Sequence, residues 1–183
     1  MNRCKWCNVF NPLYISYHDN EWGILNLNDK YLYEMFILET FQTGLSWECI
    51  LNKRDYFKKC YDNFDIDKVI NYNDLKINEL LNNKNIIRNK LKIKASIKNS
   101  KIFKEIVIEN SSFKNYLLKY FDYYPIIEND KTTSIISDNI SNDLKKRGMS
   151  FVGSITIYSY LQAVGLINSH EDNCYLNIKN KKN

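Results

Sequence analysis

Cysteine and histidine side chains near the two ends of the chain could together hold a metal ion. The sequence has two histidines, and each has a cysteine in reach: His18 follows Cys4 by 14 residues, and His170 precedes Cys174 by four. A spacing of four places two side chains on one helical face or within one turn. Two cysteines and two histidines form the tetrahedral set that structural zinc prefers, so such a site would tie the two ends of the chain together.

Cys7 offers an alternative to this set of ligands. Cys4 and Cys7 form a C-x2-C pair, a spacing that zinc knuckles use, so Cys7 could replace one of the four. The spacing equally allows these residues to be ordinary surface or core side chains, and it leaves the choice open. Cys49 and Cys60 fall within apolar helical patterns, and we expect them to be buried thiols rather than part of a disulfide framework.

A carboxylate in apolar surroundings is the second candidate for chemistry. Glu39 stands in a helical segment among Phe36, Ile37, Leu38 and Phe41. A carboxyl group in such company must be paired or functional. The alternative is a solvent-facing glutamate on an amphipathic helix, which is the commoner arrangement.

Aromatic residues gather in the same N-terminal part of the chain. The tryptophans Trp6, Trp22 and Trp47 all fall within the first 47 residues, together with Tyr14 and Tyr17. Aromatic rings can stack on a flat ligand, and they bind it more strongly when that ligand is positively charged. One or two of these rings are expected to serve simply as core.

Helical periodicity dominates the segments that would position these residues, and strand-like alternation is almost absent, so we expect an all-α fold. Asn28 or Asp29 can cap a helix that Gly44 ends. Asp65 and Asp74 can cap short helices that follow them. Further helices are expected over residues 45–60, 86–108, 113–121, 141–146 and 153–164, the last two ended by Gly148 and Gly165.

Size, composition and charge bound the class of protein. The 183 residues, 44% of them hydrophobic, suit one domain or two small lobes that share a core. No apolar run approaches the roughly 20 residues of a membrane span, and no signal segment follows the first charges, so a soluble intracellular protein is expected. The net charge of +5 favours a polyanionic partner only slightly, because abundant Lys, Asn, Ile and Tyr are typical of an AT-rich genome.

Three longer segments make the sequence specific. Residues 14–23 read YISYHDNEWG, residues 38–47 read LETFQTGLSW, and residues 145–153 read KKRGMSFVG. In this order and at this spacing they closely resemble the 3-methyladenine DNA glycosylase I family, over essentially the whole chain from Met1 to about Cys174. The resemblance implies a DNA repair hydrolase that flips 3-methyladenine out of alkylated double-stranded DNA and cleaves its glycosidic bond.

The same resemblance implies a helix-hairpin-helix glycosylase fold in which residues 1–183 form a single unit. It implies that zinc joins the terminal segments 1–23 and about 165–174, and that the hairpin lies within about 75–100. It excludes Cys7, because the family pattern needs no cysteine there. The zinc ligands that it implies are Cys4, His18, His170 and Cys174.

The resemblance also gives the carboxylate and the aromatic residues their roles. It makes Glu39 the catalytic and base-recognising residue, because an anion favours the cationic alkylated base over neutral adenine. Whether Glu39 stabilises the oxocarbenium-like sugar or orients the base stays open. Because a cationic purine leaves readily and no lysine stands in the motif as a nucleophile, a monofunctional hydrolase that leaves an abasic site is expected. The base-binding residues that it implies are Trp6, Tyr14, Tyr17, Trp22, Glu39 and Trp47.

The implied DNA-binding hairpin would fall over residues 80–94, with Asn85 where the family usually has a glycine. Asparagine is the best non-glycine residue for a left-handed backbone, so we expect the turn to survive. Backbone N–H groups at the start of the second helix would hold a phosphate. The lysines that could add counter-charge are Lys90, Lys92 and Lys94.

Two other segments are candidates for contact with the duplex. Gly44 and Leu45 stand at a helix break, and the leucine could enter the gap left by the flipped base. Lys145, Lys146 and Arg147 form a basic cluster that could bind phosphates or simply face solvent.

The sequence leaves open which alkylated bases are accepted and allows other classes of function. Phe41 departs from the family pattern, like Thr40 and Thr43, and could narrow the pocket, which leaves 3-methylguanine as a substrate open. The alternatives are a related glycosylase for a base such as 7-methylguanine, a non-catalytic DNA-binding module, and a zinc-stabilised interaction protein. Glu39 with its aromatic pocket favours the enzyme, and we expect a cytoplasmic, nucleoid-associated bacterial-type monomer.

Overall fold

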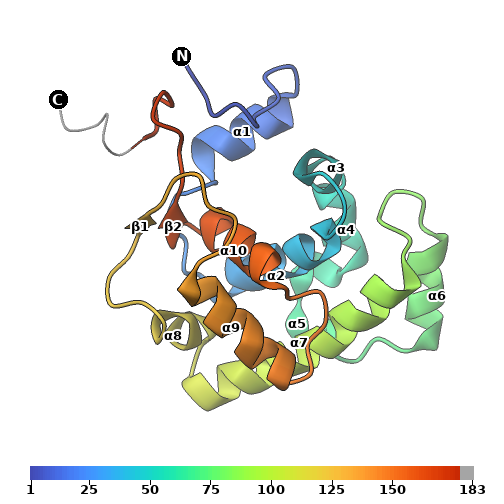
Figure 1. Cartoon of the computed structure of the whole chain (residues 1–183). Helices are drawn as coiled ribbons and strands as arrows, with labels where there is room; N and C mark the ends of the chain where they lie inside the picture. Colours follow the sequence, from blue (N-terminus) through green and yellow to red (C-terminus); the bar gives the residue numbers. More distant parts are fainter. Residues whose placement is uncertain (178–183) are drawn as a thin grey trace.

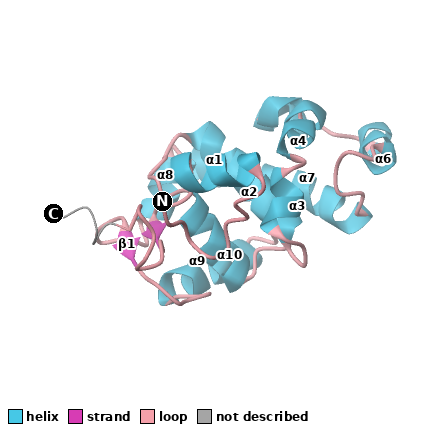
Figure 2. Cartoon of the chain, turned by 90° about the horizontal axis from the view of Figure 1, so that it is seen from above, coloured by secondary structure: helices cyan, strands magenta, loops and turns pink. Residues whose placement is uncertain are grey.

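The computed structural model describes residues 1–177, and helices dominate it, as the sequence predicts (Figure 1). Figure 2 shows that strand is confined to one side of the molecule. The elements in chain order are α1 (Pro12–Asn20), α2 (Asp29–Gln42), α3 (Trp47–Leu51), α4 (Arg54–Cys60), the 3-10 helix η1 (Asp62–Phe64), α5 (Ile66–Val69), α6 (Asp74–Asn82), α7 (Lys90–Asn110), α8 (Phe113–Leu118), β1 (Ile126–Ile127), α9 (Ile135–Lys146), α10 (Ser154–Ala163) and β2 (Ile167–Asn168).

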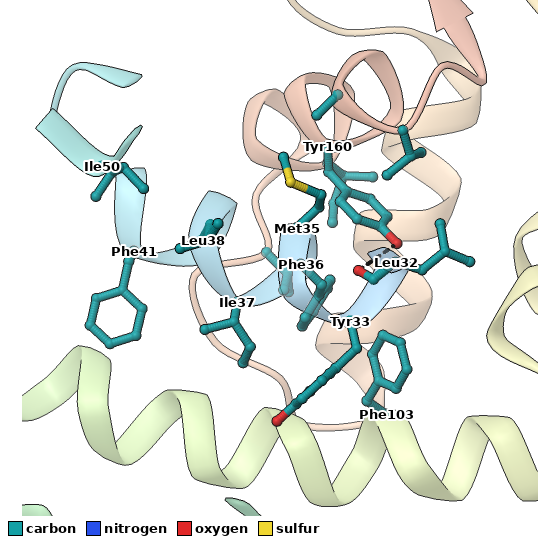
Figure 3. Packing of buried hydrophobic residues seen from close by; sticks show 14 of the residues in the cluster. Leu32, Tyr33, Met35, Phe36, Ile37, Leu38, Phe41, Ile50, Phe103 and Tyr160 are labelled. Atoms are coloured by element: carbon teal, nitrogen blue, oxygen red, sulfur yellow. Dashed lines mark hydrogen bonds between the residues drawn. The ribbon is translucent and has the colours of Figure 1, made fainter. Parts of the chain in front are cut away.

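The helix α2 lies at the centre of the fold because it is apolar on nearly every side. A helix of this kind must be covered on all sides, and α3, α7, α8 and α10 pack around it. Figure 3 shows Phe36 of α2 with Phe103 of α7 and Tyr160 of α10, whose ring centroids lie 5.6 and 5.7 Å from that of Phe36. The core therefore fixes the helix that carries Glu39.

Several helix ends follow the signals in the sequence. The side chains of Asn28 and Asp65 accept backbone N–H bonds and cap α2 and α5. Just beyond α10, Gly165 has a φ of +76°, and a Cβ at this position would lie 2.3 Å from the backbone carbon of Ile24. Only glycine permits this close approach, which brings the N-terminal segment against the end of α10.

Residues 45–60 form two helices, whereas the sequence predicts one. The Ser46 side chain caps α3, and a turn at Asn52 and Lys53 separates that helix from α4. The prediction of a buried Cys49 is wrong, because its side chain is partly exposed on the short helix α3. The prediction for Cys60 is confirmed, since that thiol is buried.

The starts of α7 and α9 also differ from the prediction. The longest helix, α7, begins at Lys90 rather than at residue 86, because the Asn89 side chain caps it. The helix α9 begins at Ile135, earlier than residue 141, because Ser134 and Ser137 form a reciprocal capping box.

The two ends of the described chain meet. The strands β1 and β2 pair in parallel, with Ile126 opposite Ile167, and they are the departure from a purely helical fold. The backbone N–H of Tyr175 donates to the carbonyl of Asn2 at 2.9 Å.

Within residues 1–177, no helix combines the length and the apolar character needed to cross a bilayer.

Candidate active site

Two helices, α1 and α2, carry three of the six candidate pocket residues. The helix α1, which periodicity does not predict, is defined by its first turn: the Asn11 side chain caps it, and Pro12 occupies a position that needs no N–H donor. It directs Tyr14 and Tyr17 to the same cavity as Glu39 of α2. The local capping chemistry of α1 therefore helps to assemble the site.

A cavity of about 320 Å³ lies between these helices, α3 and the C-terminal segment, within the size range of small-ligand sites. All six residues expected to bind a base line it, namely Trp6, Tyr14, Tyr17, Trp22, Glu39 and Trp47. The lining residues that the sequence prediction does not include are Gln42, Asp130, Lys131, Ser159, Gln162, Ser169 and Glu171.

The sequence contains a pattern that could have identified some of these additional lining residues. Gln42 follows Glu39 by three residues on α2, and Ser159 precedes Gln162 by three on α10, so helical spacing puts each pair on one face. The loop that follows β1 has no periodic pattern. Its contribution to the cavity arises only from tertiary structure.

Glu39 has an unsatisfied carboxyl group. Its side chain is almost fully buried, with 3% relative exposure for the residue, and Oε2 has no hydrogen-bond partner among the described residues. Burial raises the pKa of this carboxyl group to about 8. The solvent-facing alternative is therefore wrong, and an unpaired carboxyl at a cavity wall indicates a functional site.

Trp47 adds an unsatisfied donor to the same cavity. Its Nε1 is also buried without a partner among residues 1–177. The Tyr17 ring lies beside it, with centroids 5.0 Å apart, and burial followed by the nearby Glu39 raises the pKa of the Tyr17 hydroxyl well above its ordinary value. The cavity thus presents an acidic group, a donor and aromatic faces to any flat ligand with polar edges.

Trp6 and Trp22 connect this cavity to the histidine and cysteine cluster. Their ring centroids lie 4.7 Å apart in an edge-to-face arrangement. The Trp22 ring is 4.7 Å from that of His170, and the Trp6 ring is 5.2 Å from that of His18. These two rings therefore form part of the cavity wall and also cover the cluster.

The four terminal residues expected to bind metal do meet, and they can hold a metal ion. The ligand atoms of Cys4, His18, His170 and Cys174 are buried and lie within 4.8 Å of one another. The Cys174 Sγ is 3.5 Å from both His18 Nε2 and His170 Nδ1. The Cys4 Sγ is 3.5 Å from His170 Nδ1. Cys7 is not a member of this cluster.

The second nitrogen of each histidine is held by an acceptor. His18 Nδ1 donates to Asp19 at 2.8 Å, and His170 Nε2 donates to the carbonyl of Trp22 at 3.2 Å. Arg3 binds Asp19 at 2.7 Å, and this hydrogen bond keeps the pKa of the aspartate below its ordinary range. Outer partners of this kind orient histidine rings toward a metal.

Gly44 and Leu45 lie beside the cavity, at the end of α2. Gly44 has a φ of +78°, and Leu45 is exposed. Both line a second cavity of about 640 Å³, which shares Glu39 and Gln42 with the first and extends to residues 153–156 at the start of α10. The helix break is therefore continuous with the site around Glu39.

The segment expected to form the DNA-binding hairpin differs from the prediction. Asn85 lies between α6 and α7, but its backbone φ is not positive. The prediction of a left-handed turn at this residue is therefore wrong. Lys92 is buried and does not offer counter-charge at the surface, because its Nζ donates to the carbonyls of Phe41 at 2.8 Å and Thr43 at 2.5 Å. The exposed lysines of this region include Lys90 and Lys94.

The residues of the basic cluster at the end of α9 differ in exposure and in pairing. Lys145 and Lys146 are exposed. Arg147 donates to Glu109 at 2.8 Å and to Asp143 at 2.9 Å, so its charge is already paired. The two lysines therefore remain the better candidates for phosphate contact.

Phe41 does not narrow the cavity. It is fully buried on the other side of α2, and its ring centroid lies 4.8 Å from that of Phe57 and 6.0 Å from that of Tyr61. A helix buried on all sides can direct an added aromatic residue into the core instead of the site. The expectation of a pocket constricted by Phe41 is wrong.

Known proteins are similar to this chain in sequence and in fold. The methyladenine glycosylase family pattern matches residues 6–177. DNA-3-methyladenine glycosylase 1 of Escherichia coli is 38% identical over 180 residues, which cover 95% of this chain and 96% of that protein. DNA-3-methyladenine glycosylase of Haemophilus influenzae is 32% identical over 179 residues, which cover 94% of this chain and 96% of that protein.

Solved structures agree with this relationship. A crystal structure of 3-methyladenine DNA glycosylase I has a TM-score of 0.91 at 36% identity, covering 96% of this chain and 99% of that one. The Staphylococcus aureus 3-methyladenine DNA glycosylase I, solved to explain 3-methyladenine recognition, has a TM-score of 0.89 at 29% identity and covers 95% of each chain. The resemblance seen in the sequence is confirmed, and this chain belongs to the methyladenine glycosylase family.

Proposed function

We propose that this protein is a hydrolase that excises 3-methyladenine from alkylated double-stranded DNA and leaves an abasic site. The observation that carries the proposal is the buried, unpartnered carboxyl group of Glu39 at the wall of an aromatic cavity. The E. coli and H. influenzae relatives are named for this glycosylase activity, which supports the same activity here.

Recognition of the base would depend on charge. An N3-methylated adenine in DNA is cationic, and a cation beside a buried carboxyl group favours its ionised form. Glu39 would thus pair with the alkylated base and have no such partner in neutral adenine. The Trp47 Nε1 would donate to an acceptor on the base edge, while the rings of Tyr17 and Trp47 would stack on the base. We assign Glu39 the task of binding and orienting the base.

Water would be the nucleophile. The cationic base leaves without prior protonation, the bond between its nitrogen and the sugar carbon breaks, and water adds to that carbon and loses a proton. Lys131 is the lysine that lines the first cavity within the described part of the chain, and its ammonium group pairs with Glu128 at 2.8 Å. A lysine side chain engaged in an ion pair is poorly placed to act as a Schiff-base nucleophile, which supports a monofunctional reaction.

We assign the grip on the duplex to the hairpin between α9 and α10 instead of the region 75–100. The Asn89 side chain already occupies N–H groups at the start of α7, whereas Gly153 gives α10 no side-chain cap. The start of α10 also lines the second cavity with Glu39 and Leu45. Free N–H groups there could bind a phosphate beside the flipped nucleotide, with Leu45 filling the gap in the duplex.

The metal that fits the terminal cluster best is zinc. Zinc bonds of about 2.3 Å to sulfur and about 2.0–2.1 Å to nitrogen place tetrahedral sulfur and nitrogen ligands about 3.6 Å apart. The closest sulfur–nitrogen separations in the cluster are 3.5 Å. When bound, zinc would supply a cross-link between the two ends of the chain and no step of the reaction.

We infer that the protein works as a monomer in the bacterial cytoplasm, at the nucleoid. The proposed substrate is DNA, and the named relatives come from bacteria. Both points support this compartment.

The test is to incubate the protein with methylated duplex DNA and to separate the released bases by chromatography. We expect free 3-methyladenine and abasic sites without strand breaks. Release of mainly 7-methylguanine would instead assign a different base preference. DNA binding without any release would indicate a non-catalytic module, and the absence of both would indicate an interaction protein.

A further inference from the structure

Lys92 is a buried cation that the proposed chemistry does not use. It is the third residue of α7, and its hydrogen-bond acceptors are the main-chain carbonyls of Phe41 and Thr43. Burial lowers the pKa of its ammonium group. A charge removed from water at this cost calls for a structural or functional reason.

The carbonyls that Lys92 binds belong to the end of α2. The last carbonyls of a helix have no intrahelical N–H partner. The Thr40 carbonyl accepts from the Thr43 hydroxyl at 3.2 Å. The Gln42 carbonyl accepts from the Leu45 N–H at 2.6 Å. Lys92 supplies donors for two further carbonyls, so it fixes the turn over residues 43–45.

The same ammonium group faces the hairpin between α9 and α10. Lys92 Nζ lies 5.9 Å from the ring centroid of Phe151, within the range of a cation–π interaction. Further along α7, the Asn99 amide donates to the Ser150 carbonyl at 2.8 Å, and its oxygen accepts from the Ser150 N–H at 3.0 Å. The helix α7 thus holds both turns that border the second cavity.

We propose that Lys92 is a positioning residue that holds the 43–45 turn and the α9–α10 hairpin in the arrangement needed to grip a duplex and extrude a base. This inference rests on the proposed glycosylase function. Lys92 does not line the cavity around Glu39. It therefore acts on excision from duplex DNA and leaves the affinity of that cavity for a free base unchanged.

The test compares Lys92→Met, which keeps an unbranched apolar side chain without the charge, with Lys101→Met on an exposed part of α7. Duplex excision, tryptophan fluorescence titration with free 3-methyladenine and thermal unfolding are measured for each. For Lys92→Met, we expect kcat/KM on duplex DNA to fall by about 10-fold to 100-fold. The dissociation constant for the free base should change by less than about 2-fold. Lys101→Met should match the wild type in both measurements.

Equal duplex excision by Lys92→Met and wild type would overturn the inference, and so would a parallel loss of free-base binding. If the wild-type protein itself releases no base, the proposed function is refuted. This result differs from equal excision by Lys92→Met and wild type, so the two failures can be told apart. If Lys92→Met does not fold, Lys92→Gln takes its place with the same outcomes.

Discussion

The terminal cluster and the base cavity are neighbouring buried sites, but they differ in whether their buried polar atoms have hydrogen-bond partners. In the cluster, the second nitrogen of His18 and of His170 has an acceptor, and Asp19 is itself held by Arg3. In the cavity, the Glu39 carboxyl and the Trp47 indole each keep a buried polar atom without a partner among the described residues.

This difference separates a structural site from a binding site. A satisfied polar network makes a region rigid, whereas an unsatisfied buried group costs free energy that a ligand can recover. The Trp22 ring lies between the two, because it contacts His170 and also lines the cavity. The cluster can therefore support the cavity wall without taking part in the reaction.

The largest effect should come from breaking the satisfied site. Cys4→Ser removes one of the four proposed metal ligands. We expect the free energy of unfolding to fall by more than about 3 kcal/mol, measured by denaturant unfolding, because a metal ion bound there would contribute directly to folding. Cys7→Ser is the matched control, since this neighbouring buried thiol lies outside the cluster. It should cost only about 1 kcal/mol. Excision per folded molecule should change little in either variant.

Two results would contradict this assignment of the cluster. One is an equal loss of stability in Cys4→Ser and Cys7→Ser. The other is a loss of excision by Cys4→Ser with unchanged metal content and unchanged stability, which would give the cluster a direct part in the chemistry.

The unsatisfied site should reveal itself in the pH dependence of stability. The pKa of Glu39 rises from 4.5 to about 8 on folding, so between these values the native carboxyl keeps a proton that the unfolded one has lost. The free energy of unfolding should therefore fall as the pH rises through this window, by about 4 kcal/mol. Glu39→Gln should remove this contribution. Parallel stability curves for the two proteins would show that Glu39 is not desolvated.

A smaller effect is expected from the unpartnered donor that Trp47 contributes to the cavity lined by Glu39. Trp47→Phe keeps an aromatic face and removes the unpartnered Nε1. We expect kcat/KM for excision to fall by about 10-fold, which corresponds to the loss of one hydrogen bond to the base. An unchanged rate would mean that the indole serves only as a stacking surface.

The smallest effect should come from the exposed charges at the end of α9. Lys145→Met and Lys146→Met should each lower the slope of DNA affinity against salt concentration by about one, because each removes one phosphate contact. Arg147→Met should leave this slope unchanged, since Arg147 is paired with Glu109 and Asp143. If all three variants have the same slope, the duplex does not contact Lys145 and Lys146 in the way proposed.

Local chemistry explains which features the sequence could predict. Asn28 and Asp65 are strong capping residues, and both predicted caps are confirmed. The apolar neighbours of Glu39 in the sequence agree with the burial of its side chain. The start of α9 is missed because its capping box pairs two serines, Ser134 and Ser137, in place of a serine and an acidic residue.

Features that depend on distant partners could not be predicted in this way. Lys92 reads as one of several lysines on a surface helix, but its acceptors are carbonyls about 50 residues earlier, at Phe41 and Thr43. Arg147 reads as part of a basic run, yet one of its acidic partners, Glu109, belongs to α7. Residue type indicates charge, whereas only tertiary packing decides where that charge is used.

Glu39→Gln tests most directly whether the carboxyl group of Glu39 recognises the positive charge of the alkylated base. Release of 3-methyladenine from methylated duplex DNA is compared with the wild type at equal folded concentration, with DNA binding measured in parallel. The predicted result is a loss of release of about 100-fold or more with DNA binding retained, because the variant keeps the shape of the side chain and loses its ionisable group. Release by Glu39→Gln at the wild-type rate would contradict the claim.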